Sequence, residues 1–331
     1  MEALKSSKLE MGKPNLEIFS ETLIALARQD PDIFVVTSDS RGSAKLTPFG
    51  EQFPGQIIEV GIAEQSLVGI SAGLASAGKK VFAVSPACFL TARALEQIKN
   101  DVAYSDNPVK VTGISAGVSY GALGTTHHSL HDLAVLQAIH NINIVIPADN
   151  FETRAAIEAS VNHPRPIYIR FGKKAMPNLH ATGTPFEIGR AIVLSEGSDV
   201  TIIACGETVH PAWLASQILA DEGISCGVIS MHTIKPLDEA AVRDAAMRSR
   251  ALITVEEHSV HGGLGNRVAA LLMQAGLFRP LRIIGIPDEH TITGSQVEIF
   301  NHYGISAAGL ANTARSLLQT NSIPVLNQVT P

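Results

Sequence analysis

The stretch VGIAEQSLVGISAGLA, residues 60–75, carries a single charged side chain, Glu64. It contains no proline, and Gly69, Gly73 and Ala77 recur at every fourth position, so they would line one face of a helix. Small residues let another backbone approach closely, and a carboxyl group beside such a face would be partly dehydrated. Acids in such surroundings often belong to functional sites, although structural ion pairs produce the same effect. The stretch therefore predicts a buried helix whose lone acid is either functional or a residue that reaches solvent or caps a neighbouring backbone.

Short apolar runs and helical patterns alternate around this stretch. In the first half, the expected strands are 33–36, 81–84, 109–114, 142–146 and 167–170, and the expected helices are 16–27, 62–77, 93–104, 133–138 and 151–161. In the second half, the expected strands are 200–204, 226–230, 251–255 and 281–285, and the expected helices are 211–221, 238–249 and 266–275. Such alternation predicts an α/β fold with two parallel-sheet domains and helices on both faces of each sheet.

The chain of 331 residues has room for two domains of ordinary size. A segment of small polar residues, prolines and glycines in the middle of the chain is typical of a linker. We therefore expect an N-terminal tail at 1–13, a first domain at 14–172, a linker at 173–186 and a second domain at 187–331.

The composition excludes several classes of protein. Charged residues make up only 17% of the chain and hydrophobic residues 45%, which suits parallel strands buried on both faces. The net charge of −6, without a basic cluster, predicts no binding to nucleic acid. Cys88, Cys205 and Cys226 have neither metal-site nor disulfide spacing, so we expect reduced thiols. Residues 1–13 lack the apolar core of a signal peptide and no run of eighteen apolar residues occurs, so we expect a cytoplasmic protein without membrane contact.

Several segments together resemble the motifs of one enzyme family. Residues 60–75 are similar to the Gly-Ile-Ala-Glu-Gln helix of transketolases and related thiamine-diphosphate enzymes, and the other motifs follow in the family's order. They are TSDS at 37–40, SPACF at 85–89, GALGTTHH at 121–128, VIPADN at 145–150 and VEEHSVHGGLG at 255–265. The resemblance covers residues 14 to 320 and implies a pyrimidine-binding domain followed by a transketolase C-terminal domain.

One motif of the family does not occur in this sequence. Transketolases hold the cofactor's diphosphate through a divalent metal in a domain marked by Gly-Asp-Gly, which is absent from these 331 residues. The resemblance therefore implies the C-terminal subunit of a split transketolase. A separate N-terminal subunit would bind the diphosphate and Mg²⁺ (or Ca²⁺ or Mn²⁺), and we expect no metal ligands in this chain.

The resemblance also implies roles at the cofactor. Glu64 matches the acid that hydrogen-bonds N1′ of the aminopyrimidine ring, where it favours the imino tautomer that removes the C2 proton. Phe89 matches the aromatic residue that stacks on this ring; the alternative is an ordinary core phenylalanine. Ile62 and Ser38, within two of the motifs, are expected beside the cofactor.

Three histidines follow in the next motif. His127 falls at the family's Thr-His position, where an imidazole shuttles protons at the substrate. His128 is either a second substrate contact or a structural loop residue. His127 and His131 have a spacing that would also suit a metal site, although the family uses this segment without a metal.

Three departures from the family concern the substrate. Leu123 replaces an aspartate that reads a sugar hydroxyl, Ser115 replaces a histidine, and Glu17 lies near the position of a missing phosphate-binding arginine. Arg170, with Arg41, is the remaining candidate for holding a substrate anion. We therefore expect a rebuilt, less polar acceptor pocket that tolerates deoxy, branched or sulfo-substituted sugars.

The resemblance thus implies transfer of a two-carbon ketol unit from a ketose phosphate or modified ketose to an aldehyde. Two decarboxylating relatives are alternatives: 1-deoxyxylulose-5-phosphate synthase and the β subunit of a 2-oxoacid dehydrogenase. A non-catalytic scaffold or regulatory subunit is the alternative from another class. We expect the small helix face of Gly69, Gly73 and Ala77 at a two-fold axis, and an α₂β₂ assembly with the N-terminal subunit.

Overall fold

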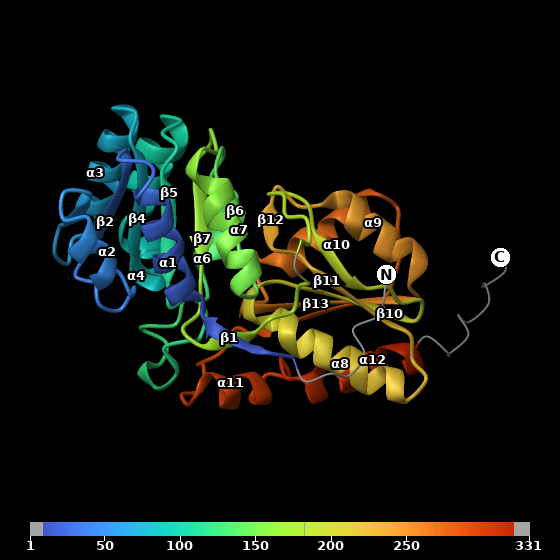
Figure 1. Cartoon of the computed structure of the whole chain (residues 1–331). Coiled ribbons are helices and arrows are strands. Elements are labelled where there is room, and N and C mark those ends of the chain that lie inside the picture. Colours follow the sequence, from blue (N-terminus) through green and yellow to red (C-terminus); the bar gives the residue numbers. More distant parts are fainter. Residues whose placement is uncertain (1–8, 182, 321–331) are drawn as a thin grey trace.

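Two sheets with helices on both faces organise the chain (Figure 1). The computed structural model describes residues 9–181 and 183–320, so the expectations about residues 1–8 and 321–331 lie outside the described residues. The α/β fold class with two parallel-sheet domains is confirmed, and each sheet carries one antiparallel edge strand. None of the helices within 9–181 and 183–320 has the length and apolar character that a membrane crossing requires.

The first sheet has seven strands among the described residues, in the order β12-β6-β7-β5-β4-β2-β3. Their bounds are β2 (Ile33–Thr37), β3 (Ile57–Glu59), β4 (Lys80–Pro86), β5 (Lys110–Ile114), β6 (Asn143–Val145), β7 (Ile167–Arg170) and β12 (Thr233–Lys235). All neighbours are parallel except β12, which comes from the second half of the chain and pairs antiparallel with β6. The two domains therefore share a sheet edge as well as a linker.

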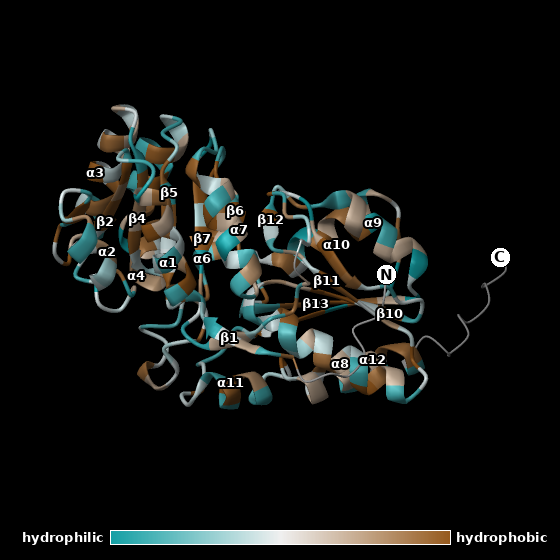
Figure 2. Ribbon diagram, viewed as in Figure 1, coloured by the Kyte–Doolittle hydropathy of each residue, from teal (hydrophilic) through white to brown (hydrophobic). Residues whose placement is uncertain are grey.

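Strand β4 shows why the first-half strands are continuously apolar. Its successive side chains enter two different cores, with Val81 and Ala83 on one face of the sheet and Phe82 and Val84 on the other. Side chains alternate along a strand, so a sheet covered on both faces needs apolar residues at every position. Figure 2 shows hydrophobic residues along the strands, whereas the helices around them carry a mixture of hydrophobic and hydrophilic residues.

The helices of the first domain differ from expectation in two regions, because the helix at 47–52 was not expected and the helix expected at 93–104 is differently placed. Their bounds are α1 (Asn15–Ala27), α2 (Thr47–Gln52), α3 (Glu64–Ser76), α4 (Ala87–Arg93), α5 (Leu95–Gln97), η1 (Ile98–Tyr104), α6 (Asp132–Ala138) and α7 (Asn150–Val161). The single helix expected at 93–104 is wrong: helical structure begins at Ala87 and runs through three pieces, the last of them π-helical. Pro86 precedes it with φ −52°, a backbone angle that suits the entry to a helix.

The second sheet has five strands among the described residues, in the order β14-β13-β10-β11-β9. They are β9 (Ile192–Ser195), β10 (Val200–Ala204), β11 (Cys226–Ser230), β13 (Ala251–Ser259) and β14 (Leu281–Ile286). The helices are α8 (Val209–Asp221), α9 (Glu239–Arg248), α10 (Leu264–Gln274), α11 (Gln296–His302) and α12 (Ala307–Thr320). The last two helices and the edge strand β9 were not expected from the sequence.

The expected tail and linker contain regular structure. Strand β1 (Met11–Pro14) pairs antiparallel with β8 (Ala175–Pro177), so the start of the first domain and the linker form one ribbon. Further along the linker, the buried His180 side chain contacts two carboxylates of the first domain. Its Nδ1 lies 2.8 Å from Asp149 Oδ2 and its Nε2 lies 3.1 Å from Glu152 Oε1. Burial lowers the pKa of His180, but the hydrogen-bonded Asp149 and the nearby Glu152 carboxylate outweigh burial and raise it to about 10.

Candidate functional site at the carboxyl edge of the first sheet

Loops at the carboxyl ends of parallel strands bring several predicted residues together. Ser38 follows β2, Phe89 lies in α4 directly after β4, and Ser115 follows β5. The Ser38 hydroxyl donates to Ser85 Oγ at 2.7 Å, which ties the first two strand ends to each other. Within residues 9–181 and 183–320, the Ser115 hydroxyl is buried and no well-formed hydrogen bond satisfies it, although it lies near the Tyr120 hydroxyl. Ligands of parallel α/β sheets bind at this edge, and such a buried hydroxyl there suits a polar ligand.

Glu64 opens helix α3 and is buried, with 4% exposure. Its carboxylate is not isolated, because Arg93 Nη1 donates to Oε1 at 2.8 Å. The Arg93 guanidinium also lies over the ring of Phe89, with its central carbon 4.4 Å from the ring centroid. Sequence reasoning missed Arg93, although its spacing of four residues from Phe89 within a helix could have paired the two.

The aromatic contacts continue from Phe89 to His127. The two rings meet edge to face with centroids 5.3 Å apart, and Tyr120 meets the other side of His127 at the same distance. Lys173 Nζ lies 4.4 Å from the centroid of the Tyr120 ring, and its side chain is exposed. An acid, an aromatic ring, an imidazole and an ammonium with no ion pair among the described residues thus lie in one row of contacting side chains.

His128 contacts its own loop. Its Nε2 donates to the carbonyl of Gly121 at 2.9 Å, and the side chain is buried with 4% exposure. Burial lowers the pKa of His128, which favours the neutral imidazole. The bond holds the 3₁₀ turn η2 (Gly121–Leu123), in which Leu123 is 55% exposed. His128 therefore orients the turn that presents Leu123.

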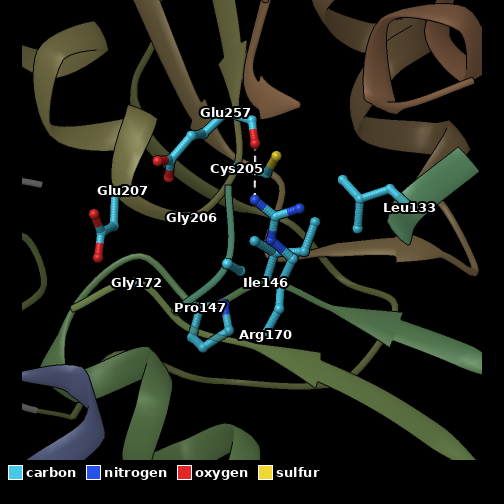
Figure 3. A pocket seen from close by; sticks show the side chains of 10 residues that line it. Leu133, Ile146, Pro147, Arg170, Gly172, Cys205, Gly206, Glu207 and Glu257 are labelled. Carbon is cyan, nitrogen blue, oxygen red and sulfur yellow. Dashed lines mark hydrogen bonds between the residues drawn. The ribbon is translucent and has the colours of Figure 1, made fainter. Parts of the chain in front are cut away.

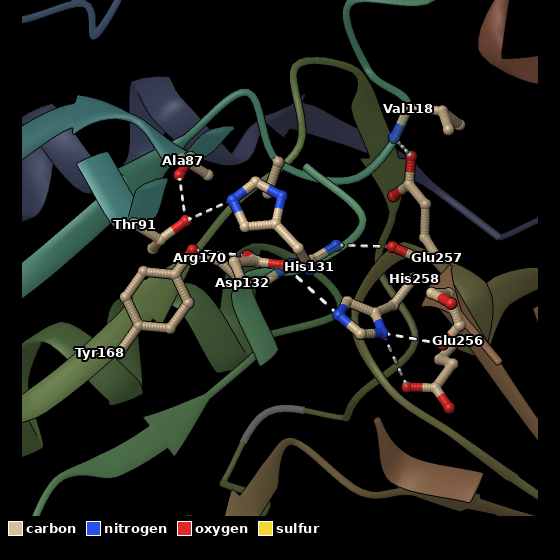
Figure 4. A network of polar contacts seen from close by, with 12 residues as sticks. Ala87, Thr91, Val118, His131, Asp132, Tyr168, Arg170, Glu256, Glu257 and His258 are labelled. Atoms are coloured by element: carbon tan, nitrogen blue, oxygen red, sulfur yellow. Dashed lines mark hydrogen bonds and ion pairs between the residues drawn. The ribbon is translucent and has the colours of Figure 1, made fainter. Parts of the chain in front are cut away.

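Arg170 is buried in the junction between the domains (Figure 4). Its Nη1 donates to both carboxylate oxygens of Asp132, at 2.8 and 3.0 Å, and its Nη2 donates to the carbonyl of Glu257 at 2.8 Å. Tyr168 donates to the same Asp132 at 2.6 Å. This placement differs from the expected role as a substrate-anion ligand, because the guanidinium already has partners within the chain.

The remaining predicted residues lie nearer the surface. Arg41 is half-buried against α2, where its Nη2 donates to the carbonyl of Thr47 at 3.3 Å. Ile62 is 74% exposed, just ahead of α3. A Cβ atom on Gly69 or Gly73 would meet nothing within 4 Å, so the described part of the chain leaves this face of α3 open.

A small cavity of about 10 Å³, room for roughly one water, lies at the domain junction beside Arg170 (Figure 3). Two buried acids line it, Glu207 and Glu257, and both accept from the amide nitrogen of Gln296, at 2.7 and 2.8 Å. Burial and the neighbouring Glu207 raise the pKa of Glu257 to about 8. Glu257 also accepts from the backbone of Val118 at 2.8 Å, so this cluster anchors the loop that leads to His127.

Metal ligation finds no support among the described residues. They contain no group of three or more His, Cys, Asp or Glu side chains that would hold an ion. His131 instead shares a hydrogen bond of 3.2 Å with the hydroxyl of Thr91.

Comparison with known proteins agrees with this architecture. Two family models match the sequence: "Transketolase, pyrimidine binding domain" over residues 14–178 and "Transketolase, C-terminal domain" over residues 189–310. The chain belongs to the transketolase family. It has the domain composition of the C-terminal subunits of split transketolases.

Individual relatives are similar over nearly their whole length. The chain is 51% identical over 297 residues to an apulose-4-phosphate transketolase subunit of Phocaeicola vulgatus, covering 89% of this chain and 95% of the relative. It is 33% identical over 303 residues to a 6-deoxy-6-sulfo-D-fructose transketolase subunit of Clostridium sp., covering 92% and 94%. A solved split-gene transketolase, described as an inactive β₄ tetramer, superimposes with a TM-score of 0.86 at 33% identity, covering 93% and 99%.

Proposed function

We propose that this chain, with an N-terminal subunit, transfers a two-carbon ketol unit from a ketose phosphate to an aldehyde, using thiamine diphosphate. The observation that carries the proposal is the buried Glu64 beside the Arg93–Phe89 stack at the carboxyl edge of the first sheet. An aminopyrimidine ring needs an acid and an aromatic face from this domain. Glu64 and Phe89 supply these two groups, and Arg93 contacts both.

The residues present fit the cofactor's pyrimidine half. Thiamine diphosphate, when bound, would supply a nucleophilic carbon for reaction at the ketose carbonyl. Glu64 would hold the proton shared with N1′ of the ring, and Phe89 would fix the plane of the ring by stacking. His127, in edge contact with Phe89, moves a proton to or from the substrate oxygen. Ser115 offers its buried hydroxyl at the same edge, and Ile62 and Ser38 are proposed to lie beside the cofactor.

The substrate anion requires a cation other than Arg170. Lys173 is exposed, has no ion pair within the described residues, and lies over Tyr120 next to His127. It therefore takes the role of phosphate ligand, with the half-buried Arg41 as the second candidate. The exposed Leu123 makes the neighbouring wall apolar. An apolar wall discriminates weakly on a sugar hydroxyl, so the proposed acceptors include aldehydes altered at that hydroxyl. By similarity to the 51% identical relative, the proposed donor is a branched ketose phosphate such as apulose 4-phosphate.

The proposed assembly is a heterotetramer with two copies of each subunit (α₂β₂) in the cytoplasm. The open face of Gly69 and Gly73, with the 39% exposed Ile70 beside it, packs against its own copy across a two-fold axis. The N-terminal subunit contributes the diphosphate site and its Mg²⁺. Sedimentation of the two subunits together tests this arrangement, and a monomeric chain in the presence of the N-terminal subunit would contradict it.

The decisive assay reconstitutes both subunits with thiamine diphosphate and Mg²⁺ and measures ketol transfer from ketose phosphates. Glu64→Ala should lower turnover by about 10²- to 10⁴-fold while the assembly stays intact, since general acid–base groups contribute effects of that size. Unchanged turnover of Glu64→Ala would show that the catalytic assignment is wrong and would favour a scaffold role.

A decarboxylating enzyme is the second candidate, because Thr126 and His127 resemble 1-deoxyxylulose-5-phosphate synthase as closely as transketolase. The same complex is therefore assayed with pyruvate. Release of carbon dioxide without ketol transfer would replace the transketolase proposal.

A further inference from the structure

Arg93 connects the two side chains on which the proposed cofactor site depends. Within α4, Phe89 and Arg93 are four residues apart and lie on one face of the helix. This face meets the first turn of α3, where Glu64 begins the helix. One guanidinium therefore hydrogen-bonds the acid and lies over the Phe89 ring, with its central carbon 4.4 Å from the ring centroid.

The carboxylate is held through one oxygen only. Arg93 bonds Oε1, while Oε2 accepts no hydrogen bond from any residue within 9–181 and 183–320. The arginine also limits where the ring of Phe89 can turn, because a guanidinium packed on one side of the ring excludes rotation into that space. The free oxygen and the ring's other face are thus fixed relative to each other before any ligand arrives.

Folding stability does not explain the contact. The Arg93 side chain is 48% exposed, and ion pairs with so much solvent access contribute little to stability. A guanidinium, unlike an ammonium, can donate to a carboxylate and stack on a ring at the same time. The contact of Arg93 with Glu64 and Phe89 therefore suits a role in binding a ligand at these two side chains.

We propose that Arg93 is a positioning residue that presets Glu64 and Phe89 for the pyrimidine ring of thiamine diphosphate. This role rests on the proposed function. It acts through Glu64 and Phe89 rather than on the reacting atoms. Without Arg93, both side chains must be ordered when the cofactor binds, and ordering two side chains weakens binding by roughly ten- to a hundredfold.

The test measures the dissociation constant of thiamine diphosphate by calorimetry, using the complex of both subunits with Mg²⁺. Arg93→Gln should raise this constant roughly ten- to a hundredfold. Arg93→Lys should restore part of the affinity, because lysine can pair with Glu64 but cannot stack on Phe89. The matched control is Arg282→Gln, which removes an exposed arginine in β14 of the second domain and should change nothing.

Two further readouts separate this role from others. In a Glu64→Gln background, Arg93→Gln should have a smaller effect, because the two residues act together. At saturating cofactor, the KM for the sugar substrate should stay within twofold of wild type; a raised KM with unchanged cofactor affinity would make Arg93 a substrate ligand and overturn the inference. Equal cofactor affinity of wild type and Arg93→Gln also overturns it. Absence of cofactor binding by the wild-type complex overturns the proposed function and this role together.

Discussion

Asp132 holds Arg170, whose other nitrogen bonds the second domain at the carbonyl of Glu257, so Asp132→Asn tests the joint between the two domains. Its side chain is fully buried and accepts from Arg170 at 2.8 and 3.0 Å and from Tyr168 at 2.6 Å. Asparagine keeps the shape but removes the charge, which leaves the buried guanidinium without its hydrogen-bonded carboxylate. Breaking a buried pair in this way costs about 3–5 kcal/mol, equivalent to about a hundredfold to several thousandfold in the folding equilibrium.

Urea unfolding measures this cost. The single tryptophan, Trp213, lies buried in α8 and reports the second domain by fluorescence, while far-UV circular dichroism reports the whole chain. The control is Asp244→Asn on the exposed side of α9, which should stay within about 0.5 kcal/mol of wild type. A loss below about 1 kcal/mol for Asp132→Asn would refute the reasoning, since it would show that Arg170 does not need this charge.

Three other perturbations follow from the structure. Gly117→Ala should lose at least about 1 kcal/mol, because the backbone has φ +60° and the new Cβ would collide with Glu257, whereas Gly55→Ala has open space and should be neutral. For His180→Gln, the loss of unfolding free energy should be largest below the unfolded-state pKa of 6.5 and should vanish as pH rises through about 10, the folded-state pKa; a loss independent of pH between 6 and 10 would contradict this. Leu123→Asp should improve discrimination, measured as the ratio of kcat/KM values, between aldehydes with and without the hydroxyl group by about tenfold or more, and an unchanged ratio would remove Leu123 from the acceptor site.

The sequence by itself determined the elements that have strong local patterns. The strand Ile167–Arg170 and the strands of the second sheet's centre, Val200–Ala204 and Cys226–Ser230, begin and end where the apolar runs do. Apolar runs that alternate with helical periodicity can bury their side chains only as parallel sheets covered on both faces. The lone charge of Glu64 in an apolar helix pointed to the candidate cofactor site, because a single acid differs clearly from the uncharged residues around it.

Tertiary structure decided the features that depend on pairing between distant segments. Short strands such as β1, β8 and β12 have too few residues for a periodic signal and exist because another strand lies beside them. The ends of Arg170 are bound to residues 38 and 87 positions away, so no local pattern could show that the arginine is engaged. The pairing of Arg93 with Glu64 likewise required the packing of α4 against the start of α3. Periodicity fixes which side of an element is buried, whereas only the assembled fold fixes which polar groups meet there.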